Sequence, residues 1–460
     1  MTGQISEAET AMILNTYMYT DYEYAEDGMT LGQIVGEMPS HIDTEGTYSP
    51  QYTILKEAVK DPETAALQIS FQSKDMGYNE GTNAATFTSK DGEHVYVVYR
   101  GTADGEWMDN GEGLTVSETA QQAEALRYFD EVAVALSGSG IGRLVVSGHS
   151  KGANKAQYVT LASEHSGYIG ACYSIDGQGM SERTIEEKKA DLGNEEFKKR
   201  QDKLYGINGQ NDYVSVLGCA VIPAAHILYV RTDAETTDFA AYHDITRMFA
   251  SCEKDPDGTE KIVYHGRKNP YVFKRGILGD YVDELSKGLM DLEDDKLKGC
   301  ASGAMQIPEA AFGGMPFGLD GSHAGLKDIR TFMFSGIPLI AGTLSGTGAG
   351  ASFTRCLLEN ERFSHTFSEK DSTFIRYGQL REESEKLTEI SEKLGDISEG
   401  ILTESYKLSF YYDSVLIKES HIKLNTSAML TQKKLIQKKA AILGDIIGMC
   451  EEFDSRSRSW

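Results

Sequence analysis

The stretch LVVSGHSKG, residues 144–152, indicates the fold of this chain more clearly than any other. Its first residues, Leu144 to Val146, are apolar and predict a buried strand. It then changes at once to GHSKG, in which Ser150 stands between two glycines, and the residues after it, ANKAQYVTLASEH, have the apolar spacing of a helix. A strand that turns this sharply into a helix strains the residue at the turn, and only small neighbours avoid a clash with it. The stretch predicts a nucleophile elbow with Ser150 at its tip, and a tight turn without chemistry is the alternative.

A serine hydroxyl needs partners before it can act as a nucleophile at neutral pH. A histidine must accept its proton, and an acid must orient that histidine. In the α/β-hydrolase fold the order along the chain is serine, acid, histidine. Asp212, in GINGQNDYVSVLG, comes just past an apolar strand, and His243, in AAYHDITRMF, follows the strand HILYVRT. Order and strand-end placement predict a triad of Ser150, Asp212 and His243.

Other residues compete for the roles of acid and base. Asp176, in YSIDGQG, also follows a strand and could orient a histidine from a neighbouring loop. His226 and His265 are further candidates for the base, although His226 precedes a strand and His265 falls in the turn-like segment VYHGRKN. His149 adjoins the serine, and we expect its side chain to point away from the reaction centre and support the structure. The sequence favours the first assignment and leaves Asp176, His226 and His265 open.

Acyl transfer also needs donors for the oxyanion of the tetrahedral intermediate. One is the backbone N–H of Lys151, because the residue after the nucleophile begins a helix whose first amides have no partner. A second comes from a loop after an earlier strand, and VYVVYRGTADGEW places Thr102 there. A plain turn is the alternative interpretation of RGT. This chemistry requires no metal and no cofactor.

Composition and charge exclude some classes of protein. The chain has 460 residues, of which 40% are hydrophobic and 25% charged, so it should fold into two or more structural units. Its formal charge of -25 repels phosphate backbones and anionic membranes, which argues against nucleic acid as a partner. A lipid substrate would have to be reached through apolar contacts.

The cysteines and the apolar segments indicate a soluble protein made in a reducing compartment. The six cysteines form no CxxC pair, so neither a zinc site nor a disulfide framework is predicted. The N-terminus lacks a basic region followed by an unbroken apolar stretch, so we expect synthesis in the cytoplasm without a signal peptide. No run of about 18 apolar residues predicts a membrane-spanning helix, since the nearest candidate, residues 334–353, is diluted by glycine and small polar residues.

The composition and the hydrophobic periodicity of the sequence change twice along the chain. Over residues 1–275 short β-rich runs alternate with amphipathic stretches, which predicts a central, mostly parallel sheet covered by helices. Residues 276–360 are rich in Gly, Ala and Met without clear periodicity, as in a mobile cover or lid, a linker or a membrane-seeking segment. Residues 361–460 predict an all-α region, either a helical hairpin or coiled-coil-like. Its apolar residues repeat at three, four or seven positions: Leu387, Ile390, Leu394, Ile397 and Ile401, then Val415, Ile422, Met429, Ile436 and Leu443.

The helical stripes of the C-terminal region require helical partners. They either pack on themselves or on the first domain, or they form an assembly surface for another protein.

Several motifs, in this order, resemble the class 3 lipases, and more closely the uncharacterised bacterial branch of lipase-like α/β-hydrolases. They are YRGT followed by Trp107 and Asp109, GHSKGAN, NGQNDYV and YHDITRMF, with AMILNTYMYTDY similar to the first helix of that branch. The resemblance spans about residues 8–255, and the chain departs from the family in lacking a proline in YVSVLG after the acid. It implies a triad of Ser150, Asp212 and His243, Thr102 as an oxyanion residue, and hydrolysis of an acyl ester.

The order of the regions resembles the lipase toxins exported by type VII secretion systems. In those proteins a helical end serves as the targeting domain and binds small helical partner proteins. The resemblance implies a phospholipase A or lysophospholipase acting as an antibacterial toxin, secreted by a non-Sec route, with an immunity protein as a further partner. A thioesterase or a peptidase on the same scaffold is an alternative, as is an inactive hydrolase domain whose helical end is the binding part.

Overall fold

The computed structural model of the chain divides into two compact units, Met1–His365 and Thr366–Trp460. It describes residues 5–78, 83–103, 106–138, 143–232, 234, 238–255, 260–311, 326–359 and 363, with isolated positions 392–393, 433–434 and 437. The apolar repeats expected from Leu387 to Leu443 lie outside the described residues. The hydrolase motifs all belong to the first unit.

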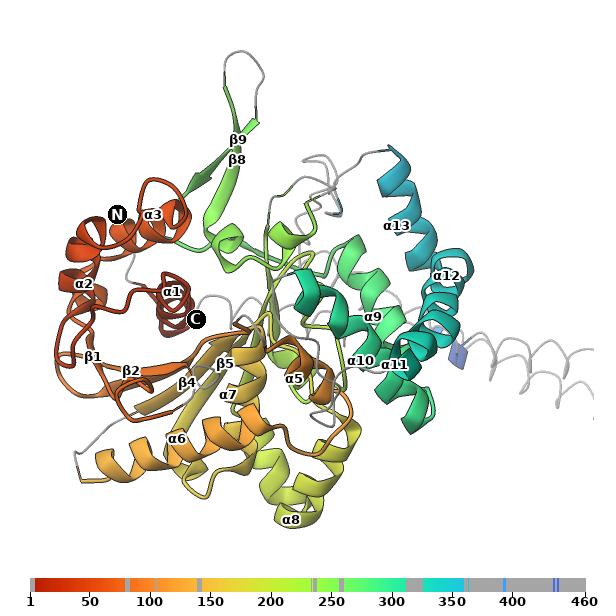
Figure 1. The fold of residues 1–460 in the computed structure, drawn as a ribbon, viewed down its shortest axis with the longest axis horizontal. Coiled ribbons are helices and arrows are strands. Elements are labelled where there is room, and N and C mark those ends of the chain that lie inside the picture. Colours follow the sequence, from red (N-terminus) through yellow and green to blue (C-terminus); the bar gives the residue numbers. More distant parts are fainter. Residues whose placement is uncertain are drawn as a thin grey trace, which may run out of the picture. The chain divides into compact units, whose positions relative to one another are not determined.

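An eight-stranded sheet organises the first unit (Figure 1). The strand order is β1-β2-β3-β4-β5-β6-β7-β10. β3 to β7 run parallel, whereas the pairs β1–β2, β2–β3 and β7–β10 are antiparallel. The bounds are β1 Gln68–Ser70, β2 Ala84–Thr88, β3 His94–Tyr99, β4 Arg143–His149, β5 Ile169–Ile175, β6 Leu204–Gly209, β7 Ile227–Val230 and β10 Tyr271–Val272. Because parallel strands share a direction, the loops after β3 to β7 gather at the carboxyl ends of these strands, on one side of the sheet.

Helices cover both faces of the sheet, as the alternation along β4 shows. Val146 packs in a core shared with α6 and α7, whereas the Ser147 hydroxyl on the opposite face accepts a hydrogen bond of 3.0 Å from Asn15 Nδ2 of α1. The helices of this part are α1 Glu7–Tyr17, α2 Leu31–Glu37, α3 Ser49–Ala58, α4 Pro62–Ala65, α5 Trp107–Glu112, α6 Ala120–Leu136, α7 Lys151–Ala162 and α8 Glu182–Gln201. Among the described residues this is the architecture of an α/β-hydrolase fold, as expected.

Short elements complete the region up to residue 275. The antiparallel pair β8 Ala250–Lys254 and β9 Glu260–Tyr264 projects away from the main sheet (Figure 1). The 3₁₀ turns are η1 Met38–Ser40, η2 Ser166–Tyr168, η3 Ala224–His226, η4 Ala240–Tyr242 and η5 Ile245–Phe249.

The described residues between 277 and 359 form a helical layer that belongs to the first unit. It consists of α9 Ile277–Met290, α10 Asp294–Ala311, α11 Leu326–Thr331, the π-helical turn η6 Phe332–Gly336, α12 Ile337–Gly346 and α13 Gly348–Glu359. α10 packs against α5, and α9 packs against α12 and α13. An aromatic cluster that includes Tyr242, Tyr281, Phe353 and Phe363 joins this layer to the hydrolase loops. None of the helices in the described part of the chain is long and apolar enough to cross a bilayer.

Candidate active site

Ser150 lies at the turn between β4 and α7 with a strained backbone. Its φ of 58° and ψ of −124° are rare for a residue with a side chain. A Cβ added at Gly152 would come 2.1 Å from the carbonyl oxygen of Tyr99, and one at Gly148 would come 2.1 Å from the carbonyl carbon of Gly152. The glycines on either side of the serine therefore allow β3, β4 and α7 to meet, as the sequence predicted for an elbow.

A continuous chain of hydrogen bonds joins the three residues expected to form the triad. The Oγ of Ser150 lies 2.8 Å from Nε2 of His243, and Nδ1 of His243 lies 2.7 Å from Oδ1 of Asp212. Because a carboxylate only accepts hydrogen bonds, Nδ1 carries the proton and Nε2 is free to accept the serine proton. The Asp212 side chain is fully buried, and its Oδ2 accepts the backbone N–H of Ser215 at 2.6 Å.

The loops after three parallel strands position these side chains. Ser150 follows β4, Asp212 follows β6, and His243 follows β7 at the end of the turn η4. The Asp212 N–H donates to the carbonyl oxygen of Gly209, which ties the acid loop to the end of its strand. The gathering of strand ends at one edge thus brings together residues that are up to 93 positions apart in the chain.

Thr102 and Lys151 both lie beside the serine. A Cβ added at Gly101 would come 3.1 Å from Cβ of Ser150, so the segment leading to Thr102 touches the elbow. The Thr102 hydroxyl accepts a hydrogen bond of 2.9 Å from Nδ2 of Asn110 in α5. Lys151 begins α7, where the first N–H groups of a helix point outward without helical partners. The arrangement can present two backbone amides to an oxyanion.

The side chain of Lys151 makes structural contacts that the sequence did not predict. It is fully buried, forms an ion pair with the carboxylate of Asp109, and donates to the backbone oxygen of Asp109 at 3.0 Å. One turn further along α7, burial lowers the pKa of Lys155 to about 8. These contacts tie α5 to α7 on one side of the serine.

The competing acid and bases have other hydrogen-bond partners. Asp176 is buried and accepts the N–H of Gly209 at 2.6 Å, while burial and the nearby Asp212 raise its pKa well above the usual range. His226 Nδ1 lies 3.0 Å from the carbonyl oxygen of Leu204, and His265 Nε2 lies 2.9 Å from the hydroxyl of Ser251. In this geometry His243, and neither His226 nor His265, bonds to Ser150, and Asp212, not Asp176, bonds to His243.

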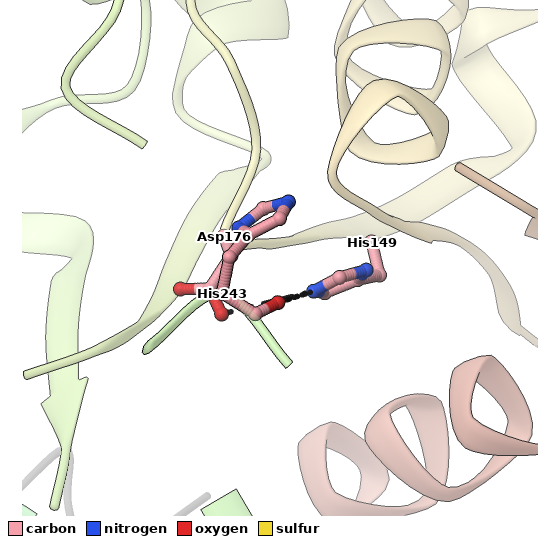
Figure 2. Close-up of side chains that lie close together, drawn as sticks. All are labelled: His149, Asp176 and His243. Carbon is pink, nitrogen blue, oxygen red and sulfur yellow. Dashed lines mark hydrogen bonds and ion pairs between the residues drawn. The ribbon is translucent and has the colours of Figure 1, made fainter. Parts of the chain in front are cut away.

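His149 differs from its expected position, because its ring lies against His243 instead of pointing away. The two ring centroids are 4.8 Å apart with an angle of 28° between the planes. Figure 2 shows His149, Asp176 and His243 side by side, and their potential ligand atoms lie within 4.8 Å of one another. Both nitrogens of each histidine are already engaged in hydrogen bonds, so this trio is poorly suited to a metal ion.

Sequence reasoning did not identify Tyr19 or Asn110. Tyr19 lies in AMILNTYMYTDY, and its hydroxyl contacts His149. The resemblance of this segment to the first helix of the lipase-like branch was the available signal. For Asn110 no signal exists in the sequence beyond its place shortly after Asp109.

Comparisons with known proteins give a partial match. A family model described as Mbeg1-like matches residues 60–245. No curated protein matches the chain. Two solved structures are similar to it: an M37 lipase at 13% identity and a TM-score of 0.28, covering 46% of this chain and 70% of that one; and the Lip2 lipase from Yarrowia lipolytica at 11% identity and a TM-score of 0.29, covering 57% and 84%. At these scores the likeness says nothing of this chain's substrate.

Proposed function

We propose that this chain is a serine carboxylic-ester hydrolase that acts on acyl esters of lipids, as a phospholipase A or lysophospholipase. The observation that carries the proposal is the unbroken hydrogen-bonded chain from Ser150 through His243 to the buried Asp212. These hydrogen-bonded residues lie at the strained turn of Ser150, beside the loop that carries Thr102. Such an arrangement serves nucleophilic acyl transfer.

The proposed reaction has two steps. His243 Nε2 takes the proton of Ser150 as Oγ forms a bond to the ester carbonyl carbon, and the amides of Thr102 and Lys151 hold the resulting oxyanion. The intermediate then releases the alcohol, which takes the proton from His243, and an acyl-serine remains. Water, deprotonated by the same histidine, attacks the acyl carbon. The bond from that carbon to Ser150 Oγ then breaks, Oγ takes the proton back from His243, and the fatty acid and free enzyme are released. Asp212 stabilises the imidazolium in both steps.

The helical layer supports a lipid as the substrate class. Phe334 is 72% exposed, Ile337 47% and Leu358 83%, and the sequence from 332 to 354 contains no charged residue. A chain with a net charge of -25 can approach a lipid through such an apolar surface. Thioesters and peptides are the alternative substrates, because triad chemistry does not select the acyl compound.

The role of the chain as an antibacterial toxin is a further part of the proposal. Its export by a non-Sec route, the binding of small helical proteins by residues 361–460 and the existence of an immunity protein rest on the sequence alone. Co-purification of the full chain with small helical proteins encoded nearby would support targeting. A full chain that is recovered alone, and is not exported by cells with an active secretion system, would contradict it.

Replacement of the nucleophile tests the catalytic proposal. We expect Ser150→Ala to lower kcat/KM for ester hydrolysis by about four orders of magnitude or more, because the triad acts as a unit. We also expect it to abolish labelling by a fluorophosphonate, which requires an activated serine. Ser137→Ala is the matched control, since Ser137 is exposed at the end of α6 and should leave both readouts unchanged. Equal activity of Ser150→Ala and wild type would remove Ser150 from the chemistry.

A panel of substrates then separates the alternatives. Release of fatty acid from phospholipid or lysophospholipid vesicles, faster than from thioesters or peptides, would support the lipid assignment. A preference for thioesters or peptides would contradict it. A wild-type protein that neither hydrolyses any of them nor takes up the fluorophosphonate would favour the inactive binding protein.

A further inference from the structure

We propose that Tyr19 and His149 are positioning residues. They hold the catalytic His243 through its ring face and its backbone, and they couple it to the oxyanion loop, residues 100–102. The inference deepens the proposed function and rests on it. Two hydrogen bonds carry the inference. The Tyr19 hydroxyl bonds to one ring nitrogen of His149, and the other ring nitrogen of His149 bonds to the backbone of His243. Neither residue touches the reacting atoms in the mechanism above.

The His149–His243 contact defines the form of the His149 ring. Nε2 of His149 lies 3.0 Å from the backbone carbonyl oxygen of His243. A carbonyl oxygen only accepts hydrogen bonds, so Nε2 carries the proton and donates it. The neutral ring then has its lone pair on Nδ1. His149 thereby holds the backbone of His243, while the side chain of His243 bonds to Ser150 and Asp212.

Tyr19 stabilises this tautomer. Its hydroxyl lies 2.8 Å from Nδ1 of His149 and can donate only if Nδ1 is unprotonated. The two rings meet edge to face, with centroids 5.3 Å apart and an angle of 83°. Without the tyrosine hydroxyl, the opposite tautomer would turn an unprotonated Nε2 toward the His243 carbonyl and repel it.

The stacked rings restrain the plane of the catalytic imidazole. His149 lies over one face of His243 at 4.8 Å, while the bonds to Ser150 and Asp212 hold the edge. His149 is only 4% exposed, and burial together with the neighbouring His243 lowers its pKa well below the usual range. It therefore stays neutral and adds no repulsion when His243 becomes positively charged during the reaction.

Tyr19 also touches the loop that leads to Thr102. A Cβ added at Gly101 would come 2.2 Å from the Tyr19 oxygen, so a side chain at that position would displace the tyrosine hydroxyl. The guanidinium of Arg100 lies 5.5 Å from the centre of the Tyr19 ring and forms an ion pair with Asp21. One tyrosine thus contacts the oxyanion loop and the ring that supports His243, so it links the two halves of the machinery.

The test compares Tyr19→Phe, His149→Gln, His149→Ala and the double variant Tyr19→Phe/His149→Gln in the full chain. We expect His149→Ala to lower kcat about 10- to 100-fold with KM nearly unchanged, since one hydrogen bond and a stacking contact are lost away from the substrate. His149→Gln should recover part of that loss, because its amide can donate to the His243 carbonyl from nearly the same place. Tyr19→Phe should lower kcat about 10-fold.

The double variant separates positioning from a general structural role. Glutamine at 149 has no tautomer for Tyr19 to select, so Tyr19→Phe should have little further effect on kcat in that background. Tyr24→Phe, an exposed tyrosine on the same segment, serves as the control with unchanged kcat. Independent effects of the two changes, kcat values equal to wild type, or losses that only follow a lowered melting temperature would overturn the inference. A wild type without esterase activity and fluorophosphonate labelling would instead contradict the proposed function itself.

Discussion

At the scale of single residues, two buried carboxylates at the ends of neighbouring strands differ in their partners. Asp212 bonds to His243, whereas Asp176 bonds to the backbone of Gly209 and lies 3.8 Å from His149. Burial and the charge of Asp212 raise the pKa of Asp176, which favours its neutral form. The sequence left both acids open, and the structure puts them in different surroundings.

These surroundings predict opposite responses to an aspartate-to-asparagine change. Asp212→Asn should lower kcat/KM by about 10³- to 10⁴-fold, because the acid no longer holds the tautomer of His243. Asp176→Asn should change it less than about tenfold, since a neutral amide resembles the protonated carboxyl and its oxygen still accepts from Gly209. Steady-state kinetics on one ester substrate measures both. A larger loss in Asp176→Asn would make Asp176 the catalytic acid.

The buried Lys155 predicts a pH-dependent stability. Burial lowers its pKa from the usual 10.5 to about 8, so below pH 8 the folded state carries a charge that costs up to about 3 kcal/mol. Between pH 8 and 10.5 the folded state loses its proton before the unfolded state does, and the cost disappears. Lys155→Met should therefore be more stable than wild type at pH 7 and lose that advantage by about pH 10.5. Urea unfolding at several pH values gives the difference, and a constant difference would contradict the prediction.

At the scale of elements, the elbow depends on close contact between backbones. Gly152 belongs to α7, and a Cβ there would lie 2.7 Å from the carbonyl carbon of Arg100 as well as close to Tyr99. Backbone atoms cannot give way as a flexible side chain can. The contact therefore sets the separation of α7 from the end of β3.

Two glycine-to-alanine changes test this contact. Gly152→Ala should lower the free energy of unfolding by about 3 kcal/mol or more, because α7 must move away from β3. Gly36→Ala, in the exposed part of α2 with no atom within 4 Å of the added Cβ, should raise it by about 0.5–1 kcal/mol. Thermal or urea unfolding of both variants measures the contrast. Similar effects of the two changes would mean that the elbow is not tightly packed.

The sequence predicts elements best where local pattern and fold agree. The strand, elbow and helix around Ser150 follow from an apolar run, two glycines and helical spacing, and the strand-end positions of Asp212 and His243 follow from chain order. The helices between 277 and 359 were not predicted, because the high Gly, Ala and Met content of residues 276–360 obscured their periodicity. α9 nevertheless carries an amphipathic pattern, with Ile277, Leu278 and Tyr281 buried at helical spacing. The Tyr19–His149 contact joins residues 130 positions apart, so no local pattern indicates it.

At the scale of the whole molecule, the helical layer is anchored beside the catalytic acid. The N–H of Gly276 donates to the carbonyl oxygen of Gln210, and a Cβ at Gly279 would come 3.0 Å from the backbone oxygen of Asp212. The N–H of Ile277 donates to the carbonyl oxygen of Phe363. The start of α9 thus packs onto the loop that carries Asp212.

Truncation at two points tests this arrangement. A chain of residues 1–365 should fold and keep fluorophosphonate labelling, because the triad and the layer against it lie in the first compact unit. A chain of residues 1–275 should lose labelling or precipitate, since it exposes Tyr242 and the Asp212 loop. Labelling of both truncated chains beside the full chain decides it. Equal labelling of the shorter chain would mean that the layer is dispensable.

The anchoring of α9 at the acid loop bears on how relatives of this chain are compared. The matched family segment ends at residue 245. Gly276 and Gly279, which closely approach Asn211 and Asp212, lie beyond that boundary. Homologues aligned only over that segment would look alike at the triad and still differ in what packs on the loop that carries the acid. Divergence in turnover among such homologues is therefore to be sought some thirty residues beyond the boundary of the shared segment.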